Sequence, residues 1–482
     1  MCSAAFVSII ELPITYAYSK ERKIKPTSIA LFAHFYTPPA TPSVHTSSTP
    51  LEISINMSED FGPDIEQLRN IRTRLDQLRN DRDHYIKAAD IDGLFLSLNS
   101  SAQVRELDLR SISGDYTLPT CMGDKDNSSA SQLLEEVLLL LSLSYMTIGK
   151  NNELPAVYTT LVVIKTLLFH LKNAGAYSRQ DLKALEARLD DISRIIENGK
   201  EKYGQVWFVF FKSQLEDCRQ SLVPVKRNLD GLSHQLDPLY EKLVSLIRQI
   251  TAVGSRPKVV ISEIKELQEK LVEVESSRVE GKFLAPDGTI PEGQEFINDL
   301  LQKCHFIADS IISGSLRVDP SLSNLHDDLV GTKGKLEQLM LTQAWSMRET
   351  DLFDILQQLR RLDSLRVNDR FVGTDGTSPE EGQKFLLYLL RKSYALIYEL
   401  LHSSKPISES LQPIFNQLST LKKCLLEVQG SGGLASIDNL RNSKDGAFHV
   451  GKEIPEGQGA VNSLLEECYE ICHGLRCQVE DS

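Results

Sequence analysis

Three cysteines and a histidine near the carboxyl terminus have side chains that bind zinc, but their spacing separates them. Cys468, Cys472, His473 and Cys477 are close in sequence, and thiolates and imidazoles are common ligands of structural zinc sites. Because a helix turns by about 100° per residue, Cys468 and Cys472 share one face while His473 and Cys477 lie on the opposite one. We therefore predict no metal site and no cofactor, and we interpret Cys468 as a small core residue.

The ten histidines are dispersed along the chain, and none belongs to a recognised catalytic motif. The chain lacks the Gly-x-Ser-x-Gly, His-Glu-x-x-His and dinucleotide-binding glycine patterns. An enzyme would require polar groups that converge in a deep pocket, with His84, His170 or His305 within reach of a carboxylate. We predict a non-enzymatic protein without catalytic residues. The alternative is an enzyme with an unrecognised helical active site.

A sequence motif occurs three times in the second half of the chain, and we call it the repeated phrase. Each copy begins with a phenylalanine, passes through a polar loop and ends in Gly-Gln; the copies span residues 283–294, 371–383 and 448–458. A Leu-Leu pair follows each Gly-Gln at the sixth and seventh positions, and a small residue at the tenth. This register predicts that each copy starts a helix whose apolar stripe includes the small residue. A weaker match, Leu140 to Tyr145 against Leu389 to Tyr394, indicates a degenerate copy upstream.

We interpret the phrase as a helix start. Thr289 with Glu292, and Ser378 with Glu381, have the spacing of a capping box, which satisfies free amides of the first turn. A glycine inside that turn would cost about 1 kcal/mol relative to alanine, so another group is expected to approach closely there. Packing by a neighbouring helix or by the loop phenylalanine is favoured over contact with a ligand or partner. The candidate interaction residues are Gly293, Gln294, Gly382, Gln383, Gly457 and Gln458.

The spacing of apolar residues predicts an all-α fold without a sheet, built of long antiparallel helices in one or two bundles. Ser178-x-x-Asp181 has capping-box spacing, and Pro155 suits a first helical turn. The C-terminal half is expected to contain about three unequal αα-hairpin repeats, with an extra helix near 325–340 between the first two. The helices outside those hairpins are expected at about 64–85, 133–145, 155–173 and 181–197, with two more within 206–253.

Composition divides the chain into three parts. Residues 1–56 are rich in Pro, Ser and Thr and are expected to be a disordered leader or extension, with a mitochondrial presequence less favoured. Residues 57–255 are expected to form an N-terminal helical bundle, and residues 256–482 a C-terminal repeat region. The aromatic run from Trp207 to Phe211 is apolar on every face of a helix, which predicts a buried segment.

Charge and cysteine usage limit the partners and the compartment. The chain has 53 Lys and Arg against 66 Asp and Glu, a net charge of -13, which disfavours binding to nucleic acid or anionic membrane. The most apolar run, Leu154 to Leu171, contains Lys165 and His170, so no transmembrane helix is expected. Eight cysteines without Cys-x-x-Cys pairs predict reduced thiols in the cytoplasm, with the nucleus as a second candidate compartment.

The Phe, Asp-Gly and Pro-Glu-Gly-Gln phrases, together with Met57-Ser-Glu-Asp and the helical body, resemble a fungal family of uncharacterised proteins, classed as a domain of unknown function. The resemblance covers about Pro63 to Arg476, and residues 1–56 depart from it. It implies a soluble, intracellular, non-enzymatic protein. It carries over no catalytic or binding residue.

The sequence does not determine a function, but it favours an adaptor. The leading hypothesis is a protein-interaction protein that binds a protein partner through a rim formed by the repeated helix starts. The residues specify neither the identity of the partner nor the oligomeric state of this protein. This hypothesis requires the three Gly-Gln positions to cluster on one exposed surface. A peripheral membrane protein is a further alternative, and it would need a helix with a basic polar face and an exposed apolar face.

Overall fold

The computed structural model describes residues 62–100, 125–174, 176–314, 317–427, 446–449 and 454–480. Within these ranges the prediction of an all-α fold is confirmed, except for one short antiparallel ribbon of β1 (Arg366–Val367) and β2 (Arg370–Phe371). Asn368 and Asp369 turn this ribbon with positive φ angles, which Asn and Asp adopt more readily than most residues. The predicted leader at residues 1–56 lies outside the described ranges.

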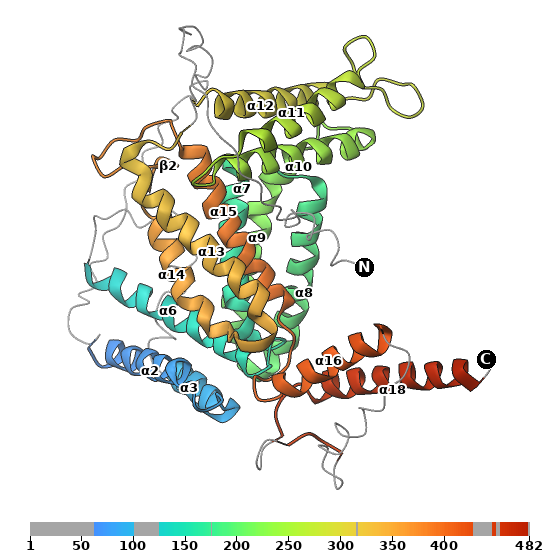
Figure 1. Ribbon diagram of the computed structural model, residues 1–482. Coiled ribbons are helices and arrows are strands. Elements are labelled where there is room, and N and C mark those ends of the chain that lie inside the picture. The colour runs from blue at the N-terminus through green and yellow to red at the C-terminus, as the bar shows by residue number, and fades with distance from the viewer. Residues whose placement is uncertain are drawn as a thin grey trace.

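The helices group into five successive units; the first and third helices of the first four units, and the two described helices of the fifth, pack side by side (Figure 1). The connection between the two helices of the fifth unit lies outside the described residues. In chain order the units are α2 (Gly62–Asn80), α3 (Ala88–Ser100) and α6 (Lys125–Thr147); α7 (Val157–Ala174), α8 (Arg179–Tyr203) and α9 (Gln205–Arg227); α10 (Asp237–Gly254), α11 (Ile261–Ser276) and α12 (Gln294–Ile312); α13 (Ser323–Ser346), α14 (Leu352–Asp363) and α15 (Gln383–Ser403); and α16 (Gln412–Glu427) with α18 (Gln458–Glu480).

Within a unit the first and third helices run in the same direction. In the second unit, Cys218 of α9 contacts the Leu161 carbonyl early in α7, and Tyr177 beyond the end of α7 donates to the Val225 carbonyl late in α9. Ion pairs between α8 and α9 join residues in the opposite order, so the middle helix runs antiparallel. Short 3-10 turns precede three of the first helices: η1 (Leu154–Ala156), η2 (His234–Leu236) and η3 (Pro320–Leu322).

A small buried residue in the third helix recurs in all five units. Three of these residues are cysteines whose thiols approach a carbonyl of the first helix at 3.5 to 3.8 Å. Close helix packing leaves no space for a longer side chain at this position. The upstream match to the repeated register is explained, because α6 and α15 are both third helices. The small residues are Ser144, Cys218, Cys304, Ser393 and Cys468.

The repeat is one helix longer than the expected hairpin. The hairpins of α11 with α12 and of α14 with α15 are the second and third helices of their units. The helix expected between these hairpins is α13, the first helix of the fourth unit. The third expected hairpin contains α16 and α18, which run in the same direction: Gly457 meets Ile407 before the two helices, and Cys468 meets Leu418 within them. Sequence signals between neighbouring residues do not show whether a repeat contains two helices or three.

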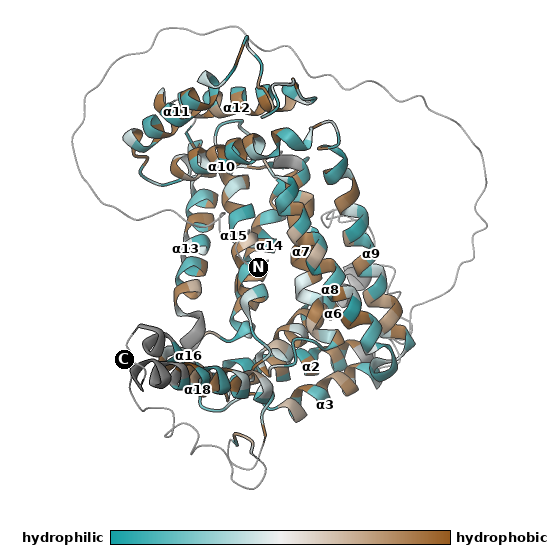
Figure 2. Ribbon diagram, turned by 90° about the vertical axis from the view of Figure 1, so that its right-hand side faces the viewer, coloured by the Kyte–Doolittle hydropathy of each residue, from teal (hydrophilic) through white to brown (hydrophobic). Residues whose placement is uncertain are grey.

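One apolar core extends from Leu68 to Leu401 through the first four units, and a smaller core from Ile407 to Cys468 holds the fifth. A domain boundary was expected at residue 256. The larger core has buried residues on both sides of that point, because α10 precedes it and packs on α12 beyond it. Figure 2 shows α7, α13 and α15 standing between α10–α12 at one end and α16 with α18 at the other.

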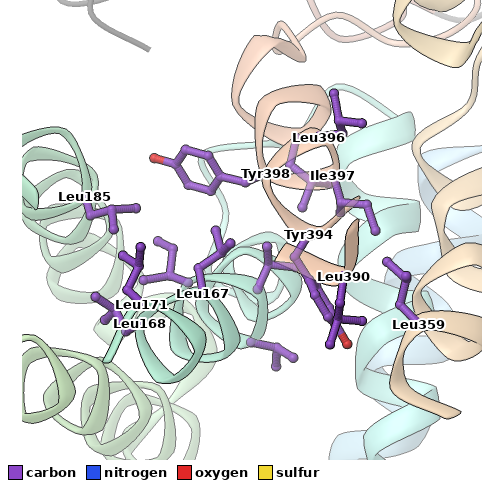
Figure 3. Close-up of a cluster of buried hydrophobic side chains, with 14 of the residues drawn as sticks. Leu167, Leu168, Leu171, Leu185, Leu359, Leu390, Tyr394, Leu396, Ile397 and Tyr398 are labelled. Carbon is purple, nitrogen blue, oxygen red and sulfur yellow. The ribbon is translucent and has the colours of Figure 1, made fainter. Parts of the chain in front are cut away.

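Helix α7 lies at the centre of the larger core. It packs on α15, and its residues meet those of α8, α14 and α15 in one apolar cluster (Figure 3). In the part of the chain that the structure describes, the segment Leu154–Lys172 is long and apolar enough to cross a membrane, but 89% of that window is buried inside the fold. Its apolar character therefore matches its position as a core helix.

Several local predictions are confirmed. Ser178 and Asp181 form the predicted capping box of α8, and the aromatic side chains of Trp207, Phe208, Phe210 and Phe211 are buried, whereas Val209 within this run is 54% exposed. The helix expected over 181–197 ends later than predicted. Gly199 faces the Leu154 side chain within the fold, and the helix continues to Tyr203.

Candidate functional site

In each repeated phrase, the glutamine side chain binds the backbone of its own loop. The Gln294 Oε1 accepts from the Phe283 N–H at 3.0 Å, and its Nε2 donates to the carbonyls of Phe283 at 2.9 Å and Pro291 at 3.1 Å. Gln383 and Gln458 bind their loops in the same way, at distances of 2.8 to 3.1 Å. We call this arrangement the glutamine clamp. It holds a phenylalanine in the core: Phe283, Phe371 or Phe448.

The glycine of each phrase is the residue before the helix, whereas the sequence placed it inside the first turn. Gly293, Gly382 and Gly457 have φ angles of 98°, 93° and 102°, and each helix begins at the following glutamine. L-residues with a side chain rarely adopt this left-handed backbone conformation. The helix start therefore needs glycine for its backbone geometry.

A close approach to these glycines is confirmed, but the approaching group is the backbone of another loop and not the neighbouring helix or loop phenylalanine that was expected. A Cβ atom added at Gly293 would lie 2.9 Å from the Leu232 Cα, and one at Gly457 would lie 2.7 Å from the Ile407 Cα. Gly382 faces Val318 in the same way, at 3.0 Å. Each of these partners lies just before the first helix of the unit. The contact therefore brings the starts of the first and third helices together.

The predicted capping boxes of the repeated phrases are wrong. The Thr289 N–H and hydroxyl both bind Asp287 Oδ1, at 3.0 and 2.6 Å, and the Ser378 hydroxyl donates to the Phe371 carbonyl at 3.0 Å. Neither α12 nor α15 has a side-chain cap. The helices start later than expected because the hydroxyl residues already stabilise the preceding turns.

The three glutamine clamps do not share a surface. Each faces a different loop, near Leu232, Val318 or Ile407, and α12 and α18 lie at opposite ends of the molecule (Figure 1). A rim made jointly by all three helix starts is therefore not formed. Contact between an individual Gly-Gln pair and a partner stays a prediction, and the clamp supplies a structural reason for each residue of the pair.

We expect the substitution Gln294→Ala to lower the free energy of unfolding by about 2 kcal/mol, because it leaves the Phe283 backbone groups without their partners. Urea unfolding followed by circular dichroism would measure the change. Gln268→Ala is the control, since this side chain makes one exposed hydrogen bond to Asp309. Equal losses in the two variants would contradict a structural role for the clamp.

The three histidines that an enzyme could use each lie near a carboxylate, but in separate places. The exposed His84 lies 3.0 Å from Asp81, His305 lies 3.5 Å from Glu275, and the buried His170 lies 3.0 Å from Asp363. These histidines belong to the α2–α3 connection, α12 and α7 respectively. They do not converge on one site.

The buried pair of His170 and Asp363 ties the second unit to the fourth. Arg366 Nη1 donates to the second oxygen of Asp363 at 3.0 Å. Burial lowers the pKa of His170, so the imidazole is neutral at pH 7. Burial alone would raise the pKa of Asp363, but the hydrogen bonds from His170 and Arg366 and the charge of Arg366 outweigh it and lower that pKa. Neither cavity described below is lined by these residues.

Two of the cavities in the described part of the molecule bear on a binding site. One, of about 80 Å³, lies where α7, α8, α10 and α15 meet, and its lining includes Arg248, Arg391 and Lys392. The other, about 450 Å³ and more open, lies beside the first repeated phrase and is lined by Arg179, His234 and residues 289–292. Gly293 and Gln294 do not line it.

Sequence reasoning missed the three cations of the first cavity. Arg391 and Lys392 directly follow the Leu-Leu pair of α15, and this was the available signal. Arg248 is far from them in sequence and joins them only in the fold. For metal ions, the residues described contain no suitable group of three or more His, Cys, Asp or Glu side chains; the side chains of Cys472 and Cys477 lie outside them.

Comparison with known proteins places the chain in a family. A family model described as "Protein of unknown function (DUF2408)" matches residues 229–349, which include the third unit and α13. The chain is 30% identical to the "Cu(2+) suppressing and bleomycin sensitive protein 1" of Saccharomyces cerevisiae, over 86% of this chain and 90% of that protein. It is 35% identical to a CUB1 family protein of Schizosaccharomyces pombe, over 86% of this chain and 92% of that protein. No solved structure matches. The chain therefore belongs to this fungal family of proteins of unknown function, as the resemblance of its repeated phrase implied.

Proposed function

We propose that this protein is a non-enzymatic adaptor of the cytoplasm or nucleus, and that α11 binds a protein partner carrying a basic segment. The observation that carries the proposal is the exposed acidic and apolar face of α11. This helix packs on α10 and α12 of its own unit and lies at one end of the molecule (Figure 1). An outer helix of this kind can accept a partner without rearrangement of the core.

The chemistry of that face favours a basic partner. Glu266, Glu269 and Glu273 are exposed along it together with Lys265 and Lys270, which leaves a net negative charge, and Val272 beside them is 58% exposed. Apolar side chains framed by charges are typical of protein interfaces, and charge complementarity accelerates encounter with an oppositely charged partner. The same unit has further exposed apolar side chains: Val260, Ile261, Val279, Leu284, Ile290 and Phe306.

Two further observations support the proposal. His84, His170 and His305 lie in separate places, so they do not form the convergent site that an enzyme of the alternative type would use. Cys218 and Cys304 are buried free thiols, which agrees with a reducing compartment.

Reversing charge on α11 tests the proposal. Affinity capture with the full chain is expected to recover a protein with a basic segment, and the double variant Glu266→Lys/Glu269→Lys is expected to retain less than about a tenth of it, since charge repulsion at an interface costs several kcal/mol. The matched control is Glu201→Lys/Glu216→Lys in the second unit, which changes the net charge equally at exposed positions. Circular dichroism would show that both variants keep their helices.

Loss of the partner from the α11 variant alone would support the proposed surface. If both variants retain the partner, or both lose it equally, α11 is not the binding surface. A partner whose α11-dependent segment proves acidic would contradict the proposed charge complementarity.

A further inference from the structure

A cavity with apolar walls and a cationic lining lies where the second, third and fourth units meet. Leu167 and Leu171 of α7, Leu185 of α8 and Ala395 of α15 supply apolar walls. Figure 3 shows the three leucines gathered opposite α15. The cavity holds about 80 Å³, enough for a small polyatomic ion or a few water molecules.

The charges that line this cavity are not balanced. Arg248, Arg391 and Lys392 face one carboxylate, that of Asp181. Asp181 Oδ2 already accepts from Arg248 Nη2 at 2.6 Å and from the Ser178 N–H at 2.8 Å, where it completes the capping box of α8. The lining therefore has more positive than negative charge, although Glu337 and Glu399 lie close enough to Lys392 to offset part of it.

Arg391 is the cation with free bonding capacity. Among the residues that the structure describes, its guanidinium makes no hydrogen bond or ion pair, whereas Arg248 binds both Asp181 and the Ala176 carbonyl. A guanidinium has five N–H donors in a rigid fork that matches two oxygens of a phosphate. The donors of Arg391 are thus placed to bind an anion at the cavity.

The electrostatic setting is consistent with an anion site. Burial, together with the charge of Arg248, lowers the pKa of Arg391 to about 10. Burial also lowers the pKa of Lys392 to about 8; Lys333 and Arg248 add to this effect, while Glu337 and Glu399 oppose it. Both side chains remain protonated at pH 7, although burial disfavours their charge. An anion bound between them would relieve that cost.

We propose that this cavity binds the phosphate group of a small phosphorylated compound, with Arg391 as its principal ligand. A phosphate monoester carries about 1.5 to 2 negative charges at pH 7, which complements the positive lining. The volume of about 80 Å³ admits the phosphate, so the rest of the compound would lie outside the cavity. The site lies between units and away from the outer face of α11, so the inference is independent of the proposed adaptor surface.

Inorganic phosphate is the probe for the first test. Isothermal titration calorimetry and thermal unfolding of the full chain would be measured in phosphate and in chloride at equal ionic strength and pH 7. Ligand that binds the folded state raises the unfolding temperature, so we expect a rise of about 2 °C or more in phosphate. Arg391→Gln is expected to abolish the rise and to weaken binding at least about tenfold, since a charged bidentate contact is lost.

The matched control is Arg361→Gln, which removes an exposed arginine of α14 and is expected to leave both measurements unchanged. In chloride, Arg391→Gln should be at least as stable as the unchanged protein, because it removes a charge that Arg248 repels. A large loss of stability in chloride would mean that Arg391 holds the fold, and the proposal would fail. It would also fail if phosphate had no effect beyond chloride, or if Arg391→Gln kept the response.

A second arm identifies the source of the phosphate. Vesicles of phosphatidylcholine with and without phosphatidic acid would be tested for co-sedimentation with the protein. Binding to phosphatidic acid that Arg391→Gln abolishes would assign the phosphate to a lipid headgroup. Binding to free phosphate without vesicle binding would assign it to a soluble compound, as we propose.

Discussion

Gly293→Ala is expected to lower the free energy of unfolding by about 3 kcal/mol or more, the sum of a backbone and a steric cost. Gly293 has a φ angle of 98°, and the added Cβ would lie 2.9 Å from both the Leu232 Cα and the Gly231 carbonyl oxygen. Because both contacts are to backbone, a side-chain rotation cannot relieve them. The start of α12 would have to separate from the turn before α10.

The substitution Gly288→Ala measures the backbone cost without the steric cost. Gly288 lies in the same loop with a φ angle of 80°, but a Cβ there would meet no atom within 4 Å. We expect a loss of about 1 kcal/mol, since only the backbone conformation is disfavoured. Urea unfolding would be followed by circular dichroism, and the midpoints of the first transition compared, because a chain of this size need not unfold in two states. Equal losses would show that the close approach contributes nothing.

Arg348→Met is expected to destabilise the protein by about 3 to 5 kcal/mol, the usual result of leaving a buried charge unpaired. The buried Arg348 pairs with the Glu409 carboxylate through Nε, and donates to the Asp81 carbonyl at 2.6 Å and to the His84 carbonyl at 2.9 Å. These partners belong to the first and fifth units and Arg348 precedes α14 of the fourth. One guanidinium therefore ties three units together.

Two further variants give this prediction its controls. Arg69→Met removes an ion pair with Glu66 whose side chains are 62% and 61% exposed, and it should cost less than about 1 kcal/mol. Arg348→Met/Glu409→Gln should recover part of the loss, because the carboxylate left alone in the single variant is then neutral. If the double variant were less stable than Arg348→Met, the unpaired charge would not be the cause of the loss.

The contacts described above act at two levels, within a unit of helices and between units. The glutamine clamp and its glycine act within a unit, where they join the start of the third helix to the turn before the first. Arg348 and the pair of His170 and Asp363 act between units. The cationic cavity belongs to the second level, since its lining comes from three units. A phosphate bound there would stabilise the packing of units against one another.

Much of the helical structure was predictable because its signals are local. Helical periodicity depends on residues three and four apart, so the buried stripe from Ile297 to Ile311 and its equivalent from Leu386 to Leu400 were readable from the chain. The unusual cost of Gly293 inside a helix start also pointed to a close approach, although its exact position in the start was misjudged.

The remaining features depend on residues that are distant in sequence. Because α10 packs on α12, the repeat is a unit of three helices. The same packing determines which backbone segment lies against Gly293. The partners of Gln294 depended on how its loop folds back, and Arg248 reached Arg391 only because three units share one core. Periodicity reports which face of a helix is buried but not which helix buries it, because many partners offer an equally apolar surface.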